Sequence, residues 1–280
     1  MQELTLNDGN TVPILGLGTY DATGDKGAKA VQMALEKGYR LIDTAAYYEN
    51  EEAVGKGIKE SGVPREEIFV TTKLWRDQLS YEQAKKGFEA SRQRLGLDYI
   101  DLYLIHWPAN AKNYDNWQKA NADTWRAMED LQAEGKIKSI GLSNFWPEHL
   151  EALAQTAKVT PAVNQIEFHP GYWQPEVTHY CKRQGITVES WSPLAQGRVL
   201  ENETIKEIAE RHQKTIAQIC LRWIVQHEVM VIPKSSNPQR MEENKDIFDF
   251  ELSDQEMEQI DSLPQTGFSG ELPNEWPDTV

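Results

Sequence analysis

The sequence predicts an α/β fold in which eight parallel strands alternate with helices and close into a barrel. Eight short apolar runs, bounded by helical patterns and rich in β-branched and aromatic residues, are typical of buried parallel strands. Eight is also the number of strands that a closed parallel barrel needs. A chain of 280 residues with 39% hydrophobic content matches a single barrel core of about 250 residues, so we expect one domain over residues 1–280. The predicted strands are 14–19, 40–43, 68–73, 101–105, 139–142, 162–166, 187–190 and 229–233.

Short motifs predict how the elements around these strands begin. A turn cluster at 7–10, between residues 3–6 and 11–12, predicts an N-terminal hairpin that plugs the bottom of the barrel. Capping boxes and one proline mark the predicted helix starts. Two irregular segments are long enough to cover the mouth of the barrel, and the second extends to the C-terminus. The capping boxes lie at 80–83 and 215–218, the proline is Pro147, and the irregular segments are 108–119 and 265–280.

Polar residues end three successive apolar runs. These residues are Asp43, Lys73 and His106, and Tyr48 follows the first of them by five positions. The carboxyl ends of barrel strands are where active sites lie. Each residue alone has a structural explanation, since an Asp is often a helix cap, a Tyr or His a satisfied core residue, and a Lys a solvated charge. Three successive strands that end this way favour a functional site.

Together these four residues supply what carbonyl reduction requires. Hydride transfer to a carbonyl carbon leaves charge on the oxygen, so a positioned general acid must deliver a proton. A tyrosine with an ordinary pKa of about 10 is a poor acid at neutral pH, but a nearby ammonium lowers that pKa. We therefore assign Tyr48 as the acid and Lys73 as the group that tunes it. Asp43 would anchor Lys73, and His106 would orient the carbonyl oxygen.

Cofactor recognition is expected without a Rossmann domain. The glycines Gly16 and Gly18 are followed by Asp21 where a third glycine should stand, and two glycines alone are a weak signal. Residues 233–244 instead gather a lysine, two hydroxyls and an arginine around a helix start near Pro238, which suits a phosphate. From spacing alone, an ordinary polar helix cap explains this segment equally well. Four strand-end residues suit a carboxamide and a stacked ring, although loop caps and a core aromatic also explain them: Ser143, Asn144, Gln165 and Trp191.

The chain resembles the aldo-keto reductase family. Residues 38–45, followed by Glu51, Val54 and Gly55, resemble the first signature of that family, and the similarity runs from residue 14 to about residue 252. It implies an (α/β)8 TIM barrel, an oxidoreductase that reduces aldehydes or ketones with a nicotinamide cofactor. Short loops make the chain similar to bacterial diketogluconate and methylglyoxal reductases. The catalytic tetrad of the family falls on Asp43, Tyr48, Lys73 and His106.

The resemblance also implies how a cofactor is bound. Residues 233–244 are similar to the family's loop for the adenosine 2′-phosphate, which implies NADPH/NADP+ rather than NADH. The residues implied to hold the phosphate and adenine are Lys234, Ser235, Ser236, Arg240, Glu243 and Asn244. Trp191 would stack on the nicotinamide where the family commonly has a tyrosine. The remaining cofactor-binding residues implied are Gly18, Thr19, Tyr20, Ser143, Asn144, Gln165, Ser192, Pro193, Leu194 and Gln196.

The substrate pocket is expected to be aromatic. Several aromatic residues follow strand ends, so their rings should crowd the mouth of the barrel. Loops there set specificity, and their sequences do not name a substrate. The residues expected to contact a small carbonyl substrate are Tyr20, Tyr48, Trp75, His106, Trp107 and Trp276.

Composition argues against several kinds of partner. The net charge of −15 disfavours nucleic acid and anionic membranes, because both need a basic face. Cys181 and Cys220 lie in helical patterns without metal-ligand spacing, which is typical of buried reduced thiols. The first residues show no apolar run of signal-peptide type, and no stretch approaches about 18 apolar residues. We expect a cytoplasmic monomer that holds no metal.

Two other functions remain open at this point. A Schiff-base aldolase would use Lys73 as its nucleophile, but it would have no use for an NADP site. A noncatalytic NADP-binding barrel protein is also compatible, since a fold does not dictate a function, although the intact tetrad weighs against it. A metal-dependent hydrolase is least favoured, because the six histidines show no close ligand pairing.

Overall fold

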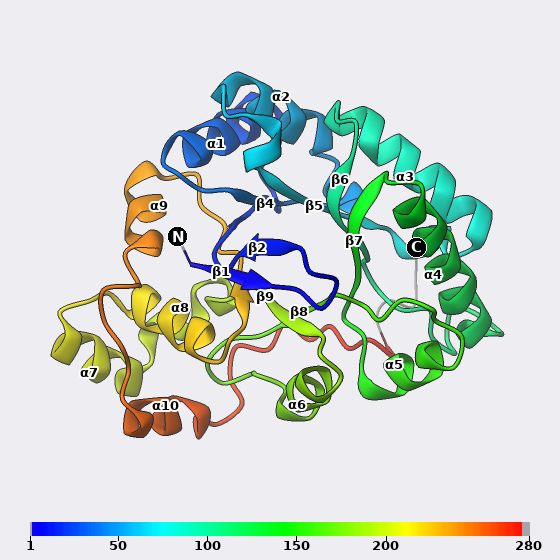
Figure 1. The fold of residues 1–280 in the computed structure, drawn as a ribbon. Helices are drawn as coiled ribbons and strands as arrows, with labels where there is room; N and C mark the ends of the chain where they lie inside the picture. Colours follow the sequence, from blue (N-terminus) through cyan, green and yellow to red (C-terminus); the bar gives the residue numbers. More distant parts are fainter. Residues whose placement is uncertain (1, 276–280) are drawn as a thin grey trace.

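Eight parallel strands form one continuous sheet in the computed structural model of the chain, which describes residues 2–275. The sheet closes on itself, because parallel bridges join Leu15 to Val231 and Gly18 to Lys234, and the Gly16 amide donates to the Val231 carbonyl at 2.9 Å. The predicted barrel is confirmed, and each predicted run overlaps one strand (Figure 1). In sheet order the strands are β3 (Leu17–Gly18), β4 (Leu41–Asp43), β5 (Phe69–Leu74), β6 (Ile100–Ile105), β7 (Ile137–Ser143), β8 (Val163–Glu167), β9 (Thr187–Trp191) and β10 (Met230–Val231).

Helices surround the barrel on the outside (Figure 1). Ser80 begins α3 by accepting from the Gln83 amide, and Thr215 and Gln218 form the predicted reciprocal capping box at the start of α8. The helices are α1 (Gly24–Glu36), α2 (Glu51–Ser61), α3 (Tyr81–Leu95), α4 (Trp117–Ala133), α5 (Pro147–Ala154), α6 (Pro175–Arg183), α7 (Glu203–His212), α8 (Ile216–Gln226), α9 (Pro238–Lys245) and α10 (Asp254–Asp261). No helix among residues 2–275 is both long and apolar enough to cross a membrane.

The predicted hairpin closes the bottom of the barrel. Its strands, β1 (Glu3–Thr5) and β2 (Thr11–Pro13), pair antiparallel and lie across the centre of the barrel in Figure 1. The Asn7 amide donates to the Pro161 carbonyl at 2.9 Å, which ties the turn to the edge of the barrel. Side chains from the hairpin and the strands form the apolar interior. They are Leu6, Val12, Leu41, Phe69, Leu102, Leu104, Ala162, Val163, Met230 and Ile232.

The pleat of the strands places the polar residues directly above this apolar interior. Side chains two residues apart on a strand face the same side. Leu41 is interior and is followed two positions later by Asp43, and Leu104 is followed in the same way by His106. On β5 the interior residue Phe69 precedes Lys73 by four positions. The polar side chains at the carboxyl end of the barrel therefore point inward.

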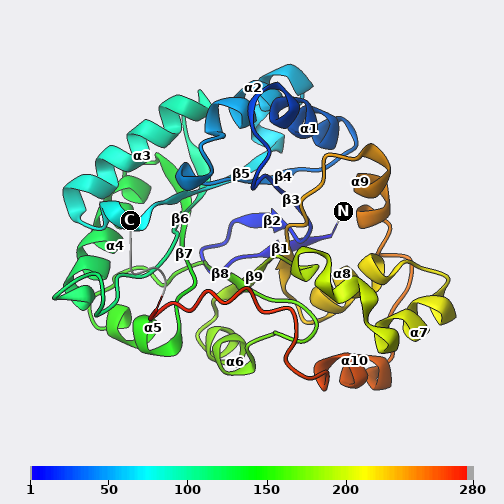
Figure 2. The ribbon, with the colours of Figure 1, turned by 180° about the vertical axis from the view of Figure 1, so that it is seen from behind.

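The chain after α10 lies over the carboxyl ends of the strands. The Ser269 amide and hydroxyl both donate to the Glu167 carboxylate at the end of β8, at 3.0 and 2.7 Å. The Asn110 side-chain amide donates to the Pro273 carbonyl at 2.9 Å. Figure 2 shows the segment after α10 running from α10 towards α5. The predicted C-terminal covering loop is confirmed up to residue 275, and Trp276 lies outside the described residues.

The other predicted irregular segment, 108–119, is shorter than expected. Helix α4 begins at Trp117, because the Asn116 side chain accepts a hydrogen bond from the Lys119 amide and caps the first turn. The covering loop on this side therefore ends at about residue 116, and its base is held by Asn110.

Candidate active site

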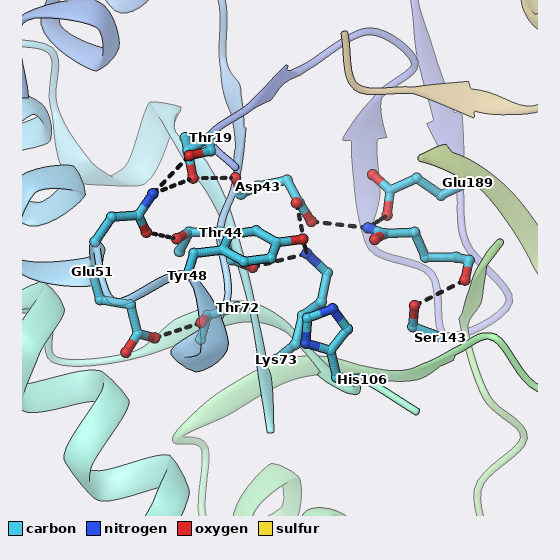
Figure 3. A network of polar contacts seen from close by, with 12 residues as sticks. Thr19, Asp43, Thr44, Tyr48, Glu51, Thr72, Lys73, His106, Ser143 and Glu189 are labelled. Carbon is cyan, nitrogen blue, oxygen red and sulfur yellow. Dashed lines mark hydrogen bonds and ion pairs between the residues drawn. The ribbon is translucent and has the colours of Figure 1, made fainter. Parts of the chain in front are cut away.

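Lys73 lies at the centre of a buried polar chain at the carboxyl end of the barrel (Figure 3). Its ammonium donates to Asp43 Oδ1 at 2.6 Å, to the Thr44 carbonyl at 2.9 Å and to the Tyr48 hydroxyl at 3.3 Å. The three bonds use the three donors of an ammonium. The predicted chain from Asp43 through Lys73 to Tyr48 is thus present in the structure.

Charge pairing keeps Lys73 and Asp43 ionised in the buried interior. Burial works to lower the pKa of Lys73, but the neighbouring Asp43 carboxylate, together with Tyr48, raises that pKa overall. Burial raises the pKa of Asp43, while Lys73 and the Gln165 amide oppose that effect. An ammonium with three acceptors holds its proton firmly. Lys73 therefore acts as a fixed positive charge beside the tyrosine.

Tyr48 is less acidic in this structure than the sequence suggested. Burial raises its pKa to about 12, and the positive charge of Lys73 pulls that pKa down without overcoming the loss of solvent. The predicted direction of the lysine effect is correct, but it is smaller than the burial effect. Tyr48 thus keeps its proton at neutral pH, as a proton donor must.

A network behind the ring holds the turn that carries Tyr48. The turn is the 3-10 helix η1 (Ala46–Tyr48), between β4 and α2. Asn50 accepts from the Thr44 hydroxyl at 2.6 Å and donates to the Thr19 carbonyl at 2.7 Å. Glu51, a residue of the family-like signature, accepts from the Thr72 hydroxyl at 2.5 Å next to Lys73. These contacts tie the turn to β3, β4 and β5.

His106 lies beside Tyr48 and is neutral at neutral pH. Burial holds the pKa of His106 well below its ordinary value, and the charge of Lys73 acts in the same direction. Its ring lies edge-on to Tyr48 with centroids 5.6 Å apart. Its Nδ1 atom is buried and has no hydrogen-bond partner among residues 2–275. A neutral imidazole with one ring N–H can donate to an oxygen without competing for the proton of Tyr48.

The residues expected at the nicotinamide are linked to one another. Asn144 donates to the His106 carbonyl at 3.0 Å and accepts from the Trp191 indole N–H at 2.8 Å. The Ser143 hydroxyl donates to the Gln165 carbonyl at 2.9 Å. Gln165 Nε2 donates to Asp43 Oδ2 at 2.9 Å, which leaves its side-chain carbonyl for a ligand. The structure brings these four residues together directly beside the hydrogen-bonded series of Asp43, Lys73 and Tyr48, which we call the acid chain.

Backbone strain marks the segment expected along the pyrophosphate. Three non-glycine residues, Ser192, Ala195 and Gln196, have positive φ angles of 49°, 47° and 55° just before and within the 3-10 helix η4 (Ala195–Glu201). Such conformations cost about 1–3 kcal/mol each and persist where surrounding structure enforces them. Pro193 is buried and Leu194 half-buried within this segment.

The segment expected at the phosphate is both a helix cap and a basic surface. Asn237 Oδ1 accepts from the Gln239 and Arg240 amides, so the first turn of α9 is already capped. The Ser235 hydroxyl is engaged with the Asn237 backbone. Lys234 and Arg240 are exposed, and Lys234 is joined to Gly18 by the bridge that closes the barrel. Ser236 is exposed on the same segment, and Glu243 and Asn244 follow on α9.

Gly18 is fitted to the barrel seam. A Cβ atom on Gly18 would lie 2.7 Å from the Ile232 carbonyl oxygen, closer than real Cβ atoms approach. The glycine thus allows β3 to meet β10. Thr19 donates its hydroxyl to the Asp43 carbonyl at 2.9 Å, so the predicted Gly18-Thr19 pair links the seam to the acid chain.

Comparison with known proteins decides the family. The sequence profile of the Aldo/keto reductase family matches residues 14–265. This chain belongs to that family. It is 51% identical over 271 residues to a glyoxal reductase of Bacillus subtilis (strain 168), covering 96% of this chain and 95% of the relative. It is 47% identical to a 9,11-endoperoxide prostaglandin H2 reductase of Trypanosoma cruzi (strain CL Brener), with 93% and 90% covered.

Solved structures agree with this assignment. A mutant of Gox0644 in complex with NADPH has a TM-score of 0.91 at 42% identity, with 98% of both chains covered. An aldo-keto reductase from a deep-sea metagenome library of the Medee basin has a TM-score of 0.89 at 46% identity, with 94% of this chain and 95% of that chain covered. Aldo/keto reductases are oxidoreductases that use NADP(H).

Aromatic rings line the mouth of this aldo/keto reductase. Tyr20 is 52% exposed and meets the Tyr48 ring edge-on at 5.1 Å. Trp75 is half-buried and meets His106 at 5.1 Å. Trp107, which was also predicted at the mouth, is 4% exposed. An aromatic wall thus stands on the Tyr48 and His106 side of the site.

Sequence reasoning missed three contributors to this site. Tyr47 stacks on Trp75 with centroids 3.9 Å apart, and its position next to Tyr48 was an available signal. The Thr44 backbone carbonyl binds Lys73, which residue type does not reveal. Glu189 lies fully buried beside Gln165, and the signal was an acid inside the apolar run of β9.

Proposed function

We propose that this aldo/keto reductase reduces aldehydes and ketones to alcohols with NADPH, and that Tyr48 delivers the proton. The observation that supports this most strongly is the buried ammonium of Lys73, which joins Asp43 to the Tyr48 hydroxyl. A tyrosine that must lose its proton needs a fixed positive charge within bonding distance, and it needs that charge held in place. Both conditions are met.

In this proposal the chain moves a proton and the cofactor supplies a hydride. Bound NADPH would supply the hydride to the carbonyl carbon. The Tyr48 O–H bond breaks as its proton passes to the carbonyl oxygen, and the phenolate left behind is paired with Lys73 at 3.3 Å. Neutral His106 donates a hydrogen bond that orients the carbonyl oxygen. Solvent then returns the proton to Tyr48.

The residues around the site suit the two ends of NADPH. The exposed cations Lys234 and Arg240 and the hydroxyl of Ser236 suit a 2′-phosphate, held by side chains because Asn237 caps the helix amides. The free side-chain carbonyl of Gln165 suits a carboxamide N–H, and Trp191 offers a half-buried flat face. The orphaned Nδ1 of His106 is a further group that a ligand would satisfy.

We further propose small 2-oxoaldehydes as the first substrates to examine. This inference rests on the 51% identity to a protein named glyoxal reductase. The exposed rings of Tyr20 and Tyr47, with Trp75, would cover the apolar side of a bound aldehyde.

The geometry disfavours a Schiff-base aldolase. A nucleophilic lysine must be a neutral amine with a free lone pair. Lys73 instead donates all three of its N–H bonds to Asp43, Thr44 and Tyr48, and the neighbouring carboxylate keeps its pKa raised. A noncatalytic NADP-binding protein would retain cofactor affinity and fail to oxidise NADPH in the presence of any aldehyde.

Replacing Tyr48 with Phe tests the chemistry. The change removes one oxygen and keeps the ring, so kcat for reduction should fall by about 10² to 10⁴ while NADPH affinity stays unchanged. Stopped-flow measurement of NADPH oxidation and tryptophan quenching titrations report the two quantities separately. Tyr180→Phe is a matched control, because Tyr180 lies on α6, outside the site, and loses the same single oxygen. A Tyr48→Phe protein with wild-type turnover would show that another group delivers the proton.

Replacing Arg240 with Ala tests the cofactor. If the guanidinium pairs with the 2′-phosphate, the change should weaken NADPH binding by roughly 1.5–3 kcal/mol and leave NADH binding unaltered. Gln239→Ala, on the same exposed first turn of α9, is the control for helix damage. An equal loss for both cofactors would remove Arg240 from the phosphate site.

A further inference from the structure

Glu189 is an acidic residue buried inside the barrel. It lies on β9, is fully buried, and is paired in register with Gln165 on β8 and Met230 on β10. Figure 3 shows it on the far side of Asp43 from Tyr48, within the same polar layer. The reaction proposed above gives Glu189 no role.

One amide nitrogen connects Glu189 to the acid chain. Gln165 Nε2 donates to Glu189 Oε2 at 2.8 Å and to Asp43 Oδ2 at 2.9 Å, so both of its hydrogens are used. The side-chain orientation of Gln165 is therefore set by two carboxyl groups at once. The other oxygen of Glu189, Oε1, is buried and has no partner within the described part of the chain.

The charges in this layer do not balance if both carboxyl groups ionise. The charged groups that interact electrostatically with Glu189 are Asp43 on β4 and Lys73 on β5. Its neighbours on β8 and β10 are the uncharged Gln165 and Met230. Lys73 spends its bonds on Asp43, Thr44 and Tyr48. An unpaired carboxylate in a dry interior is far more costly than a neutral acid. Glu189 is thus the member of the pair that keeps a proton.

We propose that Glu189 is a positioning residue, which as a neutral carboxylic acid holds Gln165 against Asp43 and so fixes the acid chain that ends at Tyr48. When Glu189 ionises, a second negative charge enters the chain and attracts the Gln165 amide away from Asp43. The added charge also opposes formation of the Tyr48 phenolate. Carbonyl reduction should therefore weaken at alkaline pH through Glu189. No proton passes between Glu189 and Tyr48.

The electrostatics agree with the geometry. Burial raises the pKa of Glu189, and the charge of Asp43 acts in the same direction; Gln165 and Lys73 oppose the shift, which leaves that pKa at about 8. Because the folded pKa lies above the ordinary one, the stability that neutral Glu189 provides is lost as the pH rises towards 8. Glu189→Gln, which cannot ionise, should remove that loss.

Carboxyl ¹³C NMR of glutamate-labelled protein without cofactor tests the protonation directly. We expect a glutamate resonance that is protonated at neutral pH, titrates in the alkaline range and is absent from Glu189→Gln. Glu51→Gln is the matched control, because Glu51 is equally buried but is paired with Arg94, so the resonance that titrates in the alkaline range should remain in this variant. If the resonance lost in Glu189→Gln is a carboxylate at neutral pH, the proposal is overturned. This readout does not depend on the proposed reductase activity.

Kinetics test the positioning role, which rests on the proposed function. Glu189→Gln preserves the shape of the neutral acid, so it should keep wild-type kcat/KM at neutral pH and lose the alkaline decline. Glu189→Ala leaves Gln165 unsupported and should lower kcat/KM by about 10-fold to 100-fold, the loss seen when the hydrogen-bond partner behind a metal ligand is removed. An alkaline decline retained in Glu189→Gln, or wild-type kinetics in Glu189→Ala, would exclude the role. If the Glu189 variants exclude this role while Tyr48→Phe still loses activity, only the role of Glu189 is refuted and the reductase proposal stands.

Discussion

Replacing Lys73 with Met removes the only cation bonded to Asp43 among the described side-chain contacts. The Asp43 side chain is 2% exposed and would remain at 2.9 Å from the Gln165 amide, with its ion-pair partner gone. Removing one member of a buried ion pair costs about 3–5 kcal/mol, because the other charge is left in the interior. We therefore expect Lys73→Met to lower the free energy of unfolding by about that amount at neutral pH.

The pH dependence of this loss has a definite sign. Without Lys73, the ammonium no longer opposes the effect of burial, which raises the pKa of Asp43. Asp43 of the variant is therefore already protonated when the buffer is made mildly acidic. A raised folded pKa provides stability at low pH that is lost as the pH rises through it. The difference in the free energy of unfolding between Lys73→Met and wild type should therefore be smaller in mildly acidic buffer.

A double-mutant cycle with Asp43→Asn separates charge from packing. The double variant has no buried charge to strand, so it should be more stable than Lys73→Met alone. Urea unfolding followed by tryptophan fluorescence measures all four proteins. A loss of no more than about 1 kcal/mol in Lys73→Met, the value of an exposed pair, would refute the buried-pair reasoning. So would a double variant whose losses simply add.

Two further changes test other parts of the fold. Burial opposes ionisation of Glu256, but its bonds to the Ser253 amide, His212 and Arg211 hold its pKa at about 2. Its stabilisation is therefore present above the ordinary pKa of about 4.3 and lost as the pH falls towards 2, so Glu256→Gln should have a lower Tm at neutral pH and match wild type in strong acid. Gly18→Ala forces a Cβ against the Ile232 carbonyl oxygen and should cost about 1–3 kcal/mol in chemical denaturation while weakening NADPH binding. An unchanged midpoint in either experiment would contradict the contact involved.

Local patterns in the sequence were sufficient to predict the barrel. A strand repeats every two residues, so an apolar interior residue such as Leu104 implies that His106 also faces inward. The clustering of Asp43, Tyr48, Lys73 and His106 was predictable for this reason, because each of them ends a strand or follows one closely. The start of α9 at Pro238 was predictable as well, since a proline and an Asn cap are local signals.

Relative magnitudes were less predictable. The sequence suggested that Lys73 would make Tyr48 a stronger acid, and the charge does act in that direction. The pKa of Tyr48 nevertheless stands at about 12, because burial acts more strongly. Desolvation depends on how many atoms surround a group, and the strands and loops that surround Tyr48 come from distant parts of the chain.

What the sequence determined by itself was the set of strands, the inward phase of their side chains and the types of residue at their ends. Tertiary structure decided which of those residues contact one another and how their charges interact. Asp43 and Gln165 are 122 positions apart, and only the closed sheet and the register of Gln165 with Glu189 place one amide between two carboxyl groups. Periodicity is a property of neighbours along the chain, whereas pairing and desolvation in the interior arise only when the eight strands meet.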